Sequence, residues 1–564
     1  MEFNLIEKQW IPVLRRDGTK AMIAPWEVTD NFAENPVVSL NAPRPDFNGA
    51  LIQFLIGLVQ TVAAPQSGLE WRKKLLEPPT AEELKALFTT VQHAFELGGN
   101  GPRFMQAFEA FDDFTLSGVA GLLIDAPGEN ALNQNKDHFV KRGTVNAMCL
   151  SCAATALFTS QTNAYGDGPG YRTSLRGGSG PLTTLVISDD RHNTLWQLIW
   201  LNVLEKRGFL SLCADQEKNA YEDTFPWLAA TRTSEKDTGV ETTPMDVHPA
   251  QMFWSMSQRI KLNIEEAQGG NCDICGAAFK KAVMNFKKKN SGVNYVGSWL
   301  HPLTPYGRKE DGTTIPSHGE RGGLTYRHWL GYINVDSANN KSPAKVVHEF
   351  YERIKPDWQF RLWIFGYDIY NSAKIRCWYE AQMPLLDMDK KHLKAFENET
   401  ANLIVSASEV SANLKTAVKR ALFSKVKEIK KTGEAVWETP SLVKEDKELF
   451  YQLALAFWQS TESAFYQSAI GIKSCLESGE DSLSVKLQWH RSILSAGEKI
   501  YSDYVMASSI EDADPKRVVI ARKELEQYNR SKKIKGLLGI PVEPKGTDKK
   551  TKGKKAAKQA ELAL

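Results

Sequence analysis

The sequence lacks the long hydrophobic run of a membrane-spanning segment. Its most apolar stretch, residues 50–64, is shorter than the ~20 residues that such a segment needs, and Gln53 and Gln60 interrupt it. We expect it to form a buried helix instead. The chain also begins without the basic and apolar run of a secretory signal. These absences predict a cytoplasmic protein with no membrane contact.

Motifs of known catalytic chemistry are missing too. The sequence contains no phosphate-binding P-loop, no H-E-x-x-H motif, no G-x-S-x-G motif and no His-Asp dipeptide. Charge of one sign is not in excess, because 70 Lys and Arg stand against 67 Asp and Glu, a net charge of +3. This balance argues against coating nucleic acid with the whole surface, but it leaves room for a local basic groove. We expect the chain not to be an enzyme.

Cysteine is scarce, with 7 in 564 residues, and without a secretory signal this suggests a reducing compartment. Four cysteines form two C-x-x-C pairs, Cys149 with Cys152 and Cys272 with Cys275. Two such pairs complete a tetrahedral shell of four sulfurs for Zn²⁺. The pairs lie far apart in the sequence, so the zinc would join distant segments and add its binding energy to the folded state.

Two other interpretations of these cysteines stay open. A C-x-x-C pair can be a redox motif, although neither pair lies in a recognisable β-α-β setting. The four thiols can also be unrelated buried side chains. A catalytic zinc is disfavoured because four thiolates leave no position for water. We expect Cys213, Cys377 and Cys475 to be core or surface thiols.

The length exceeds what one hydrophobic core supports, so at least two domains are expected. Residues 1–385 alternate short β-like runs, such as Trp10–Val13 and Leu182–Ile187, with helical pieces and many Gly and Pro breakers. Asp17-Gly18 between two apolar runs indicates a hairpin turn. This pattern predicts a large, irregular N-terminal α+β domain that contains the zinc-stapled knuckle.

Residues 386–540 have a different pattern, in which apolar residues recur every three or four positions, as on one face of a helix. Four such segments joined by short polar loops predict an all-α four-helix bundle, with Pro515 in the first turn of the last helix. The apolar positions are Leu403, Ala407, Val410, Leu414, Ala417 and Ala421, then Leu449, Leu453, Ala456, Phe465 and Ala469, then Leu483, Leu487, Ile493 and Leu494, then Val518, Val519, Ala521, Leu525 and Tyr528. Residues 541–564 are rich in lysine and predict a disordered tail, or a loose electrostatic contact with nucleic acid.

Two segments are candidates for nucleic-acid contact. The glycine-rich loop at 166–170 allows close approach of the backbone, and Tyr171, Arg172 and Arg176 after it could stack and bind phosphate. The run 279–289, directly after the second cysteine pair, contains five lysines. The glycine-rich loop can also be a simple turn, and the lysine run can also be a solvated face. Because both segments follow the predicted zinc knuckle, we expect them to converge on one surface.

A resemblance to a known family rests on longer stretches. The run from Cys149 to Ala164, continued by 171–178 and 181–184, resembles the CasA family, the large subunits of type I-E CRISPR Cascade complexes. Residues 4–13, the stretch 299–305 and the helical C-terminal part support it. The resemblance implies an N-terminal α+β domain with a zinc site, followed by a four-helix bundle.

The resemblance also implies a function. Members of this family are non-catalytic. They read the short protospacer-adjacent motif (PAM) in double-stranded DNA, open the neighbouring base pairs for the guide RNA so that an R-loop forms, and help to recruit a helicase–nuclease in antiviral defence. Base pairing reads the target sequence while protein reads the PAM. The implied partners are the other Cascade subunits, the crRNA 5′ end, the target duplex and the helicase–nuclease.

The resemblance assigns DNA-contacting residues by matching motifs. The family's glycine loop corresponds to Gly168, Pro169 and Gly170, and its lysine finger corresponds to Lys289, with Lys288 as the alternative. The wedge that splits the duplex corresponds to Asn371, Ser372 and Ala373. A further loop, which contacts the crRNA 5′ end and a neighbouring subunit, corresponds to Phe139, Val140, Lys141 and Arg142.

Two positions depart from the family pattern. Ser372 stands where the best-known wedge has Gln, and Pro169 stands where another member has Gly, which removes one backbone N–H donor. We therefore expect a PAM preference that differs from that of other members. Two competing functions stay open at this point, a zinc-containing nucleic-acid-processing enzyme such as a nuclease, and a helical scaffold protein whose cysteines bind no metal.

Overall fold

The computed structural model divides the chain into two compact units. The first unit comprises Met1–Leu324 and Gly331–Leu386, and the second comprises Thr325–Leu330 and Asp387–Leu564. The structure describes residues 3–128, 133, 135, 140–166, 168, 170–178, 180–189, 193–212, 220–319, 321–334, 336, 340–353, 355–370, 374–431, 434–506 and 514–542. The lysine-rich tail from residue 543 lies outside this set.

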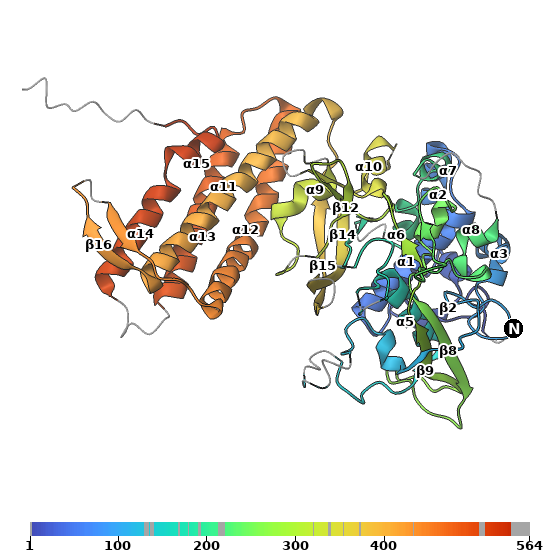
Figure 1. Cartoon of the computed structure of the whole chain (residues 1–564). Helices are drawn as coiled ribbons and strands as arrows, with labels where there is room; N and C mark the ends of the chain where they lie inside the picture. Colours follow the sequence, from blue (N-terminus) through green and yellow to red (C-terminus); the bar gives the residue numbers. More distant parts are fainter. Residues whose placement is uncertain are drawn as a thin grey trace, which may run out of the picture. The chain divides into compact units, whose positions relative to one another are not determined.

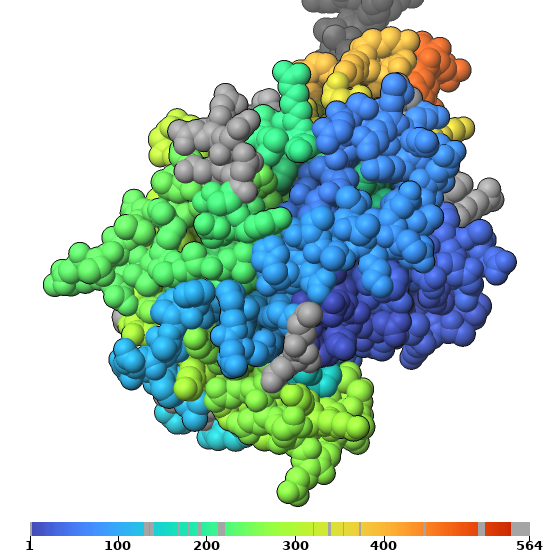
Figure 2. Space-filling model, turned by 90° about the vertical axis from the view of Figure 1, so that its right-hand side faces the viewer, coloured from blue at the N-terminus to red at the C-terminus, as the bar shows by residue number. Residues whose placement is uncertain are grey.

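The first unit mixes helices with several small sheets (Figure 1). Figure 2 shows one of its faces, where blue N-terminal segments and green segments near residues 200–290 lie side by side. The α-helices that lie wholly within it, among the described residues, are α1 (Pro45–Val62), α2 (Gly68–Leu76), α3 (Ala81–Thr89), α5 (Leu150–Thr162), α6 (Leu195–Leu201), α7 (Lys206–Leu210), α8 (Tyr221–Thr224) and α10 (Lys345–Glu352). Helix α9 (Trp329–Ile333) begins in the segment that belongs to the second unit.

Helix α1 is buried along nearly its whole length, as the sequence predicted. Its two glutamines are satisfied inside the core, because Gln53 donates to the carbonyl of Gly49 at 2.8 Å and Gln60 donates to that of Leu204 at 3.1 Å. Phe54 on this helix makes edge-to-face contacts with five aromatic rings, Trp10, Phe95, Phe104, Phe158 and Trp254. Within the described residues, no helix is long and apolar enough to cross a bilayer.

Two of the predicted strands and the predicted hairpin are confirmed. Strand β1 (Ile11–Arg15) pairs antiparallel with β2 (Lys20–Ile23) around Asp17-Gly18, and β3 (Val37–Leu40) pairs with the other edge of β1. A second sheet has the order β15 (Lys374–Leu385), β14 (Phe360–Tyr370), β6 (Thr183–Ser188). The predicted strand at 182–187 is thus the edge strand β6 of a sheet whose long hairpin is β14–β15.

A third sheet carries the cysteine pairs and the lysine run. Strand β9 (Lys281–Lys289) pairs with β8 (Arg259–Glu266) on one side and with β4 (Thr115–Gly118) and β5 (Met148–Cys149) on the other. Short strands complete the unit: β7 (Glu241–Thr242), β10 (Asn294–Tyr295), β11 (Tyr306–Arg308), β12 (Thr314–Pro316) and β13 (Lys341–Ser342).

The second unit is mostly helical. Helix α11 (Lys390–Phe423) packs against α12 (Lys444–Ser478), α13 (Leu483–Met506) and α14 (Pro515–Asn529), and a short α15 (Lys532–Leu537) follows. All six predicted apolar positions of α11 are buried. Pro515 is the first residue of α14, and the Asp514 side chain caps this helix by accepting from the backbone N–H groups of Lys516 and Arg517.

Two details of the helical prediction are wrong. Leu487, Val519 and Tyr528 are exposed, because other residues of α13 and α14, such as Trp489 and Leu525, fill the buried faces. The connection between α11 and α12 is not a short loop but contains the hairpin β16 (Lys425–Ile429) and β17 (Ala435–Glu438). This hairpin is tied to α14, because the Trp437 indole donates to the Glu524 carboxylate at 3.0 Å.

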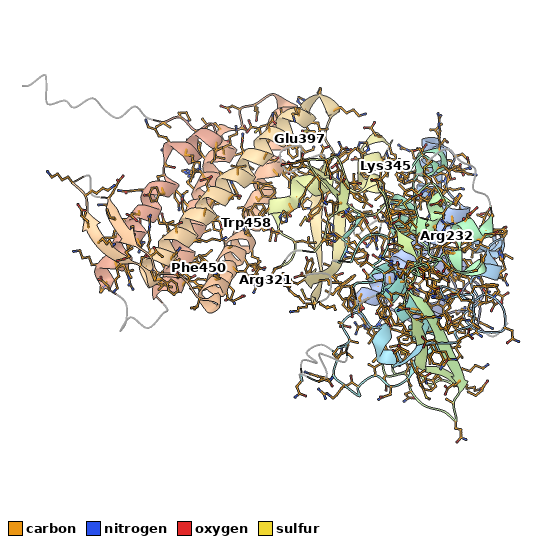
Figure 3. All side chains as sticks on the ribbon, viewed as in Figure 1. Arg232, Arg321, Lys345, Glu397, Phe450 and Trp458 are labelled. Carbon is orange, nitrogen blue, oxygen red and sulfur yellow. The ribbon has the colours of Figure 1, made fainter. Side chains whose placement is uncertain are left out.

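The core of the helical unit includes the segment Thr325–Leu330, which precedes the last strands of the first unit in the chain. The ring of Tyr326 stacks on Phe465 with centroids 4.3 Å apart, and its hydroxyl lies 2.8 Å from that of Thr461. It also contacts Trp458 of α12, which Figure 3 labels in the helical unit. Trp329 contacts Phe465 at right angles, with centroids 5.5 Å apart. The helices therefore close around two aromatic rings that come from outside them.

Candidate metal centre and nucleic-acid interface

The two cysteine pairs meet because strands β5 and β9 are neighbours. Cys149 ends β5 and is the N-cap of α5, which places Cys152 in the first turn of that helix. Cys272 and Cys275 lie in the turn between β8 and β9. Pairing of Cys149 with Ala282 in the ladder brings this turn beside α5. The predicted long-range staple thus has a simple cause, a strand pair between distant segments.

The four sulfur atoms form a compact cluster that can hold a metal ion. All of them lie within 4.8 Å of one another, and Sγ of Cys149 and Sγ of Cys275 are 3.8 Å apart. A zinc ion with Zn–S bonds of about 2.3 Å sets its sulfurs about 3.8 Å apart at the corners of a tetrahedron. The donor set and its spacing therefore fit Zn²⁺.

Asp273 braces the two halves of the cluster against each other. Its carboxylate accepts from the backbone N–H groups of Asn146 and Ala147 at 2.7 and 2.9 Å. Its own N–H donates to the carbonyl of Ala147 at 3.0 Å. These three bonds fix the turn of the second cysteine pair to the residues just before the first pair.

The close approach of the sulfurs shifts the pKa values of Cys152 and Cys272. The neighbouring Cys149 and Cys272 sulfurs, together with burial, raise the pKa of Cys152. Hydrogen bonds from Cys149 and Cys152 lower the pKa of Cys272. Several thiolates cannot share so small a space without a cation, so a divalent ion is the natural partner of the fully ionised cluster. Of the other cysteines, Cys377 and Cys475 are half-buried free thiols, and Cys213 lies outside the described residues.

The glycine loop is anchored to the end of the lysine strand. Gly168 and Gly170 have positive φ angles of 110° and 82°, while Pro169 lies outside the described residues. A Cβ at Gly170 would lie 3.1 Å from the Asn290 side chain, and the carbonyl of Gly170 accepts from the N–H of Ser291 at 2.8 Å. Only glycine suits this position, because both the backbone angle and the close neighbour disfavour a side chain.

The lysines at the end of β9 lie against aromatic rings. Nζ of Lys288 is 4.2 Å from the ring centre of Tyr171, which directly follows the glycine loop. Nζ of Lys287 is 4.4 Å from the ring centre of Phe114. Lys289 is half-buried and pairs through its backbone with Arg259. Of the two candidates for the lysine finger, Lys288 is the one with a contact to the loop. The lysine run and the glycine loop therefore converge, as the sequence predicted.

Of the two arginines after the loop, Arg176 is not available to phosphate as the sequence suggested. The guanidinium of Arg176 is buried, and it donates to Gln53, Thr183 and Thr304 at 2.8 to 3.2 Å. It braces the core and cannot reach solvent without disrupting those bonds. Nε of Arg172 donates to the hydroxyl of Ser234 at 2.7 Å, which fixes the loop to a neighbouring segment.

The other two predicted contact elements are described only in part. Asn371, Ser372 and Ala373 lie outside the described residues; in the sequence they stand between the paired strands β14 and β15. Phe139 also lies outside them. Val140 is buried, whereas Lys141 and Arg142 are exposed, and Arg142 donates to the side chain of Asn135 at 2.9 Å.

Comparison with known proteins identifies the family. The chain matches the family described as CRISPR-associated protein Cse1 (CRISPR_cse1) over residues 4–499. The chain belongs to the Cse1 family. Cse1 is the protein that is also called CasA, the family expected from the sequence motifs.

Solved Cse1 structures share the fold. The Cse1 structure from Acidimicrobium ferrooxidans has a TM-score of 0.66 at 15% identity, with 94% of this chain and 98% of that chain covered. CasA from Thermus thermophilus has a TM-score of 0.65 at 14% identity, covering 96% and 100%. A chain in a structure described as a CRISPR RNA-guided surveillance complex has a TM-score of 0.62 at 14% identity, covering 94% and 99%.

Several residues that shape this Cse1 site have no sequence motif of their own. Asn290 and Ser234 hold the glycine loop, and Phe114 lies against the lysine strand. Each is an ordinary side chain whose partner is distant in the sequence, so single-sequence patterns do not identify it. Only Asn290, next to the lysine run, could have been suspected from position alone.

Proposed function

We propose that this chain is the large subunit of a type I-E CRISPR Cascade surveillance complex. In this role it recognises the PAM in double-stranded target DNA, promotes duplex opening and R-loop formation, and helps to recruit the helicase–nuclease in antiviral defence. It performs no catalysis itself and works in the cytoplasm. Membership of the Cse1 family and the shared fold with a chain of a surveillance complex support this proposal.

One observation carries the DNA-binding part of the proposal. The glycine loop and the end of the lysine strand meet through the Gly170–Ser291 hydrogen bond and the Lys288–Tyr171 contact. A backbone that a duplex can approach closely thus lies beside a cation that can neutralise phosphate. In the minor groove such a surface distinguishes mainly A·T from G·C pairs, which suits tolerant reading of a short motif.

The proposed mechanism divides the work among three elements. The loop Gly168, Pro169, Gly170 and the lysine finger, Lys288 or Lys289, hold the PAM duplex. The turn Asn371, Ser372, Ala373 enters the duplex at the first target pair. Unstacking costs a few kcal/mol per step, which protein contacts and the growing RNA–DNA heteroduplex offset.

Zinc has a structural part in this proposal. Bound by Cys149, Cys152, Cys272 and Cys275, it would supply rigidity where β5, α5 and the β8–β9 turn meet. The strand β9 leaves this point and ends at the lysines beside the glycine loop. The exposed Lys141 and Arg142, with Phe139 and Val140, are the proposed contact to the crRNA 5′ end and the neighbouring Cascade subunit.

The proposed domain organisation follows the family pattern. We assign residues 1–385 to an α+β domain, 386–540 to a four-helix bundle and 541–564 to a lysine-rich tail. The packing of α11 against α12, α13 and α14 supports the bundle. The segment Thr325–Leu330 is an addition to that bundle from within the first range.

The experiment that tests the proposal uses the assembled, crRNA-loaded complex with and without this chain. Both are incubated with target duplexes that carry a randomised PAM, and the bound fraction is sequenced. Tight binding and a PAM preference that appear only when the chain is present support the proposal. Equal selection without the chain contradicts it.

A further inference from the structure

The end of the β14–β15 hairpin is held firmly from the core side. Tyr367 on β14 is buried, and its hydroxyl donates to the carboxylate of Asp46 at 2.6 Å. The Asp46 carboxylate is also paired with the guanidinium of Arg44 at 3.0 Å. Gly180 fits tightly beneath this strand, because a Cβ there would lie 2.0 Å from the carbonyl oxygen of Tyr367. These contacts tie β14 to the core of the first unit, where Figure 1 shows β14 and β15 side by side.

Beyond these contacts the hairpin changes register, and an aromatic ring becomes exposed. The pairing of β14 with β15 shifts between Asp368 and Ile369, and Ile369 is still buried. Tyr370, the last residue of β14, is 49% exposed. Arg376 on β15 lies over its ring, 4.5 Å from the centre, and donates to the buried carboxylate of Asp368 at 3.2 Å. The ion pair thus fixes a guanidinium that in turn fixes the ring.

This arrangement suits a flat, negatively charged partner. Tyr370 is half exposed although Arg376 lies over one face of its ring, so another planar group can stack on it. Lys374 and Arg376 carry two positive charges at the hairpin end, and Asp368 carries one negative charge, so the net charge there is positive. A nucleobase with its phosphate has this combination of a π-face and an anion.

The hairpin base also connects to the glycine loop. Tyr165, in the stem of that loop, packs against a buried cluster of Ile124, Tyr367 and Ile369. Both elements belong to the first unit. A second cation–tyrosine pair, Lys288 over Tyr171, lies at the other end of the loop. Cation–aromatic pairs therefore occur on both elements that the proposed function places on DNA.

We infer that Tyr370, held in place by Arg376, stacks on a base of the first target pair when the duplex opens. This inference rests on the proposed function and adds to it a residue outside the wedge triplet. The aromatic ring replaces stacking that the opened duplex loses, a contribution that a short side chain at the turn cannot supply. Base–aromatic stacking of this kind is worth about 5-fold to 150-fold in affinity when the ring is removed.

The test measures coupling between the ring and one base. The crRNA-loaded complex is assembled with wild-type chain, Tyr370→Ala, Tyr370→Phe or the control Tyr221→Ala, which removes another tyrosine of the first unit that is 50% exposed. Equilibrium binding is measured for three PAM-containing target duplexes. One is intact, and the other two have an abasic nucleotide at the first target position of one strand or the other.

We expect Tyr370→Ala to weaken binding of the intact target by about tenfold. The effect should shrink to near unity for the abasic target that lacks the stacking partner, while Tyr370→Phe and Tyr221→Ala should bind like the wild type. Binding unchanged by Tyr370→Ala overturns the inference. So does an equal loss on all three targets, which would assign Tyr370 to a protein contact. If the complex assembled without this chain binds the intact target as tightly as the complete complex does, the proposed function itself fails.

Discussion

The sulfur atoms of Cys149 and Cys275 lie 3.8 Å apart although 126 positions separate them in the sequence. This distance equals the edge of a tetrahedron of sulfurs around zinc, about 3.8 Å for Zn–S bonds of about 2.3 Å. The contact closes a long loop of chain, and the glycine loop and strand β8 lie within that loop. A metal ion at this point would therefore stabilise the segments proposed to contact DNA.

We expect the purified chain to contain about one zinc ion and Cys272→Ser to lose it, because three thiolates hold the ion much less tightly than four. Zinc content by mass spectrometry and the thermal unfolding midpoint, each with and without a chelator, measure this. The matched control is Cys475→Ser, since Cys475 is a half-buried free thiol of α12 outside the cluster. Equal zinc content in the two variants would contradict the assignment.

Tyr326 offers a test of the helical unit. Replacing it with Ala removes a ring that stacks on Phe465, and we expect a loss of about 3–5 kcal/mol in the free energy of unfolding. Tyr326→Phe should cost only about 1 kcal/mol, because the Thr461 hydroxyl keeps its bond to the carbonyl of Phe457. Denaturant unfolding measures both. The control is Tyr528→Ala, because Tyr528 is exposed. If Tyr528→Ala lowers the free energy of unfolding as much as Tyr326→Ala does, Tyr326 is not a packed residue of the helical core.

Local patterns were enough to predict much of this fold. The apolar spacing of residues 403–421 predicted a buried helix face, and Asp17-Gly18 predicted the first hairpin, because both depend on neighbours in the sequence. The place of Tyr326 in the helical core could not be predicted, since its partners on α12 and α13 are far away in the chain. The hairpin β16–β17 was missed because its two strands are only five and four residues long, too short for a clear alternation.

The site shows the same division. The spacing of the two C-x-x-C pairs was enough to predict the cysteine cluster, and the local composition was enough to single out the lysine run and the glycine loop. Their contact depends on strand β9 crossing the whole distance between the cysteines and the loop, which is a property of the sheet. Arg176 was misassigned because a basic residue beside a glycine loop has the same pattern whether it faces solvent or the core.

His301 predicts a specific dependence of stability on pH. Burial, with a smaller contribution from Arg176, lowers the pKa of this imidazole well below its ordinary value of 6.5. Below about pH 6.5 the unfolded chain binds a proton that the folded chain does not, so stability falls as the pH falls. His301→Asn, which can still accept from the N–H of Leu303, should be less stable at neutral pH but should lose less stability towards about pH 5.

Unfolding midpoints of the two proteins across this pH range check the prediction. His248, His318 and His490 also have lowered pKa values, so the stability of the His301→Asn variant still falls with pH, and only the difference between the two proteins is informative. Parallel curves would show that His301 is protonated in the folded state as easily as in the unfolded one.

Substitution of Lys288 tests whether its ammonium group contacts a DNA phosphate or is only solvated. In the assembled complex, Lys288→Ala should weaken binding of a PAM-containing duplex by about 5-fold to 10-fold and lower the salt slope by about one, because one phosphate contact is lost. Lys289→Ala should cost less, since only Lys288 among these two has a contact with Tyr171 beside the glycine loop. Lys281→Ala is the control on the same strand, where the ammonium pairs with Glu266 at 3.1 Å. If Lys288→Ala leaves both affinity and salt slope unchanged while Lys289→Ala lowers them, the finger is Lys289 and the aromatic contact of Lys288 serves only to hold the loop.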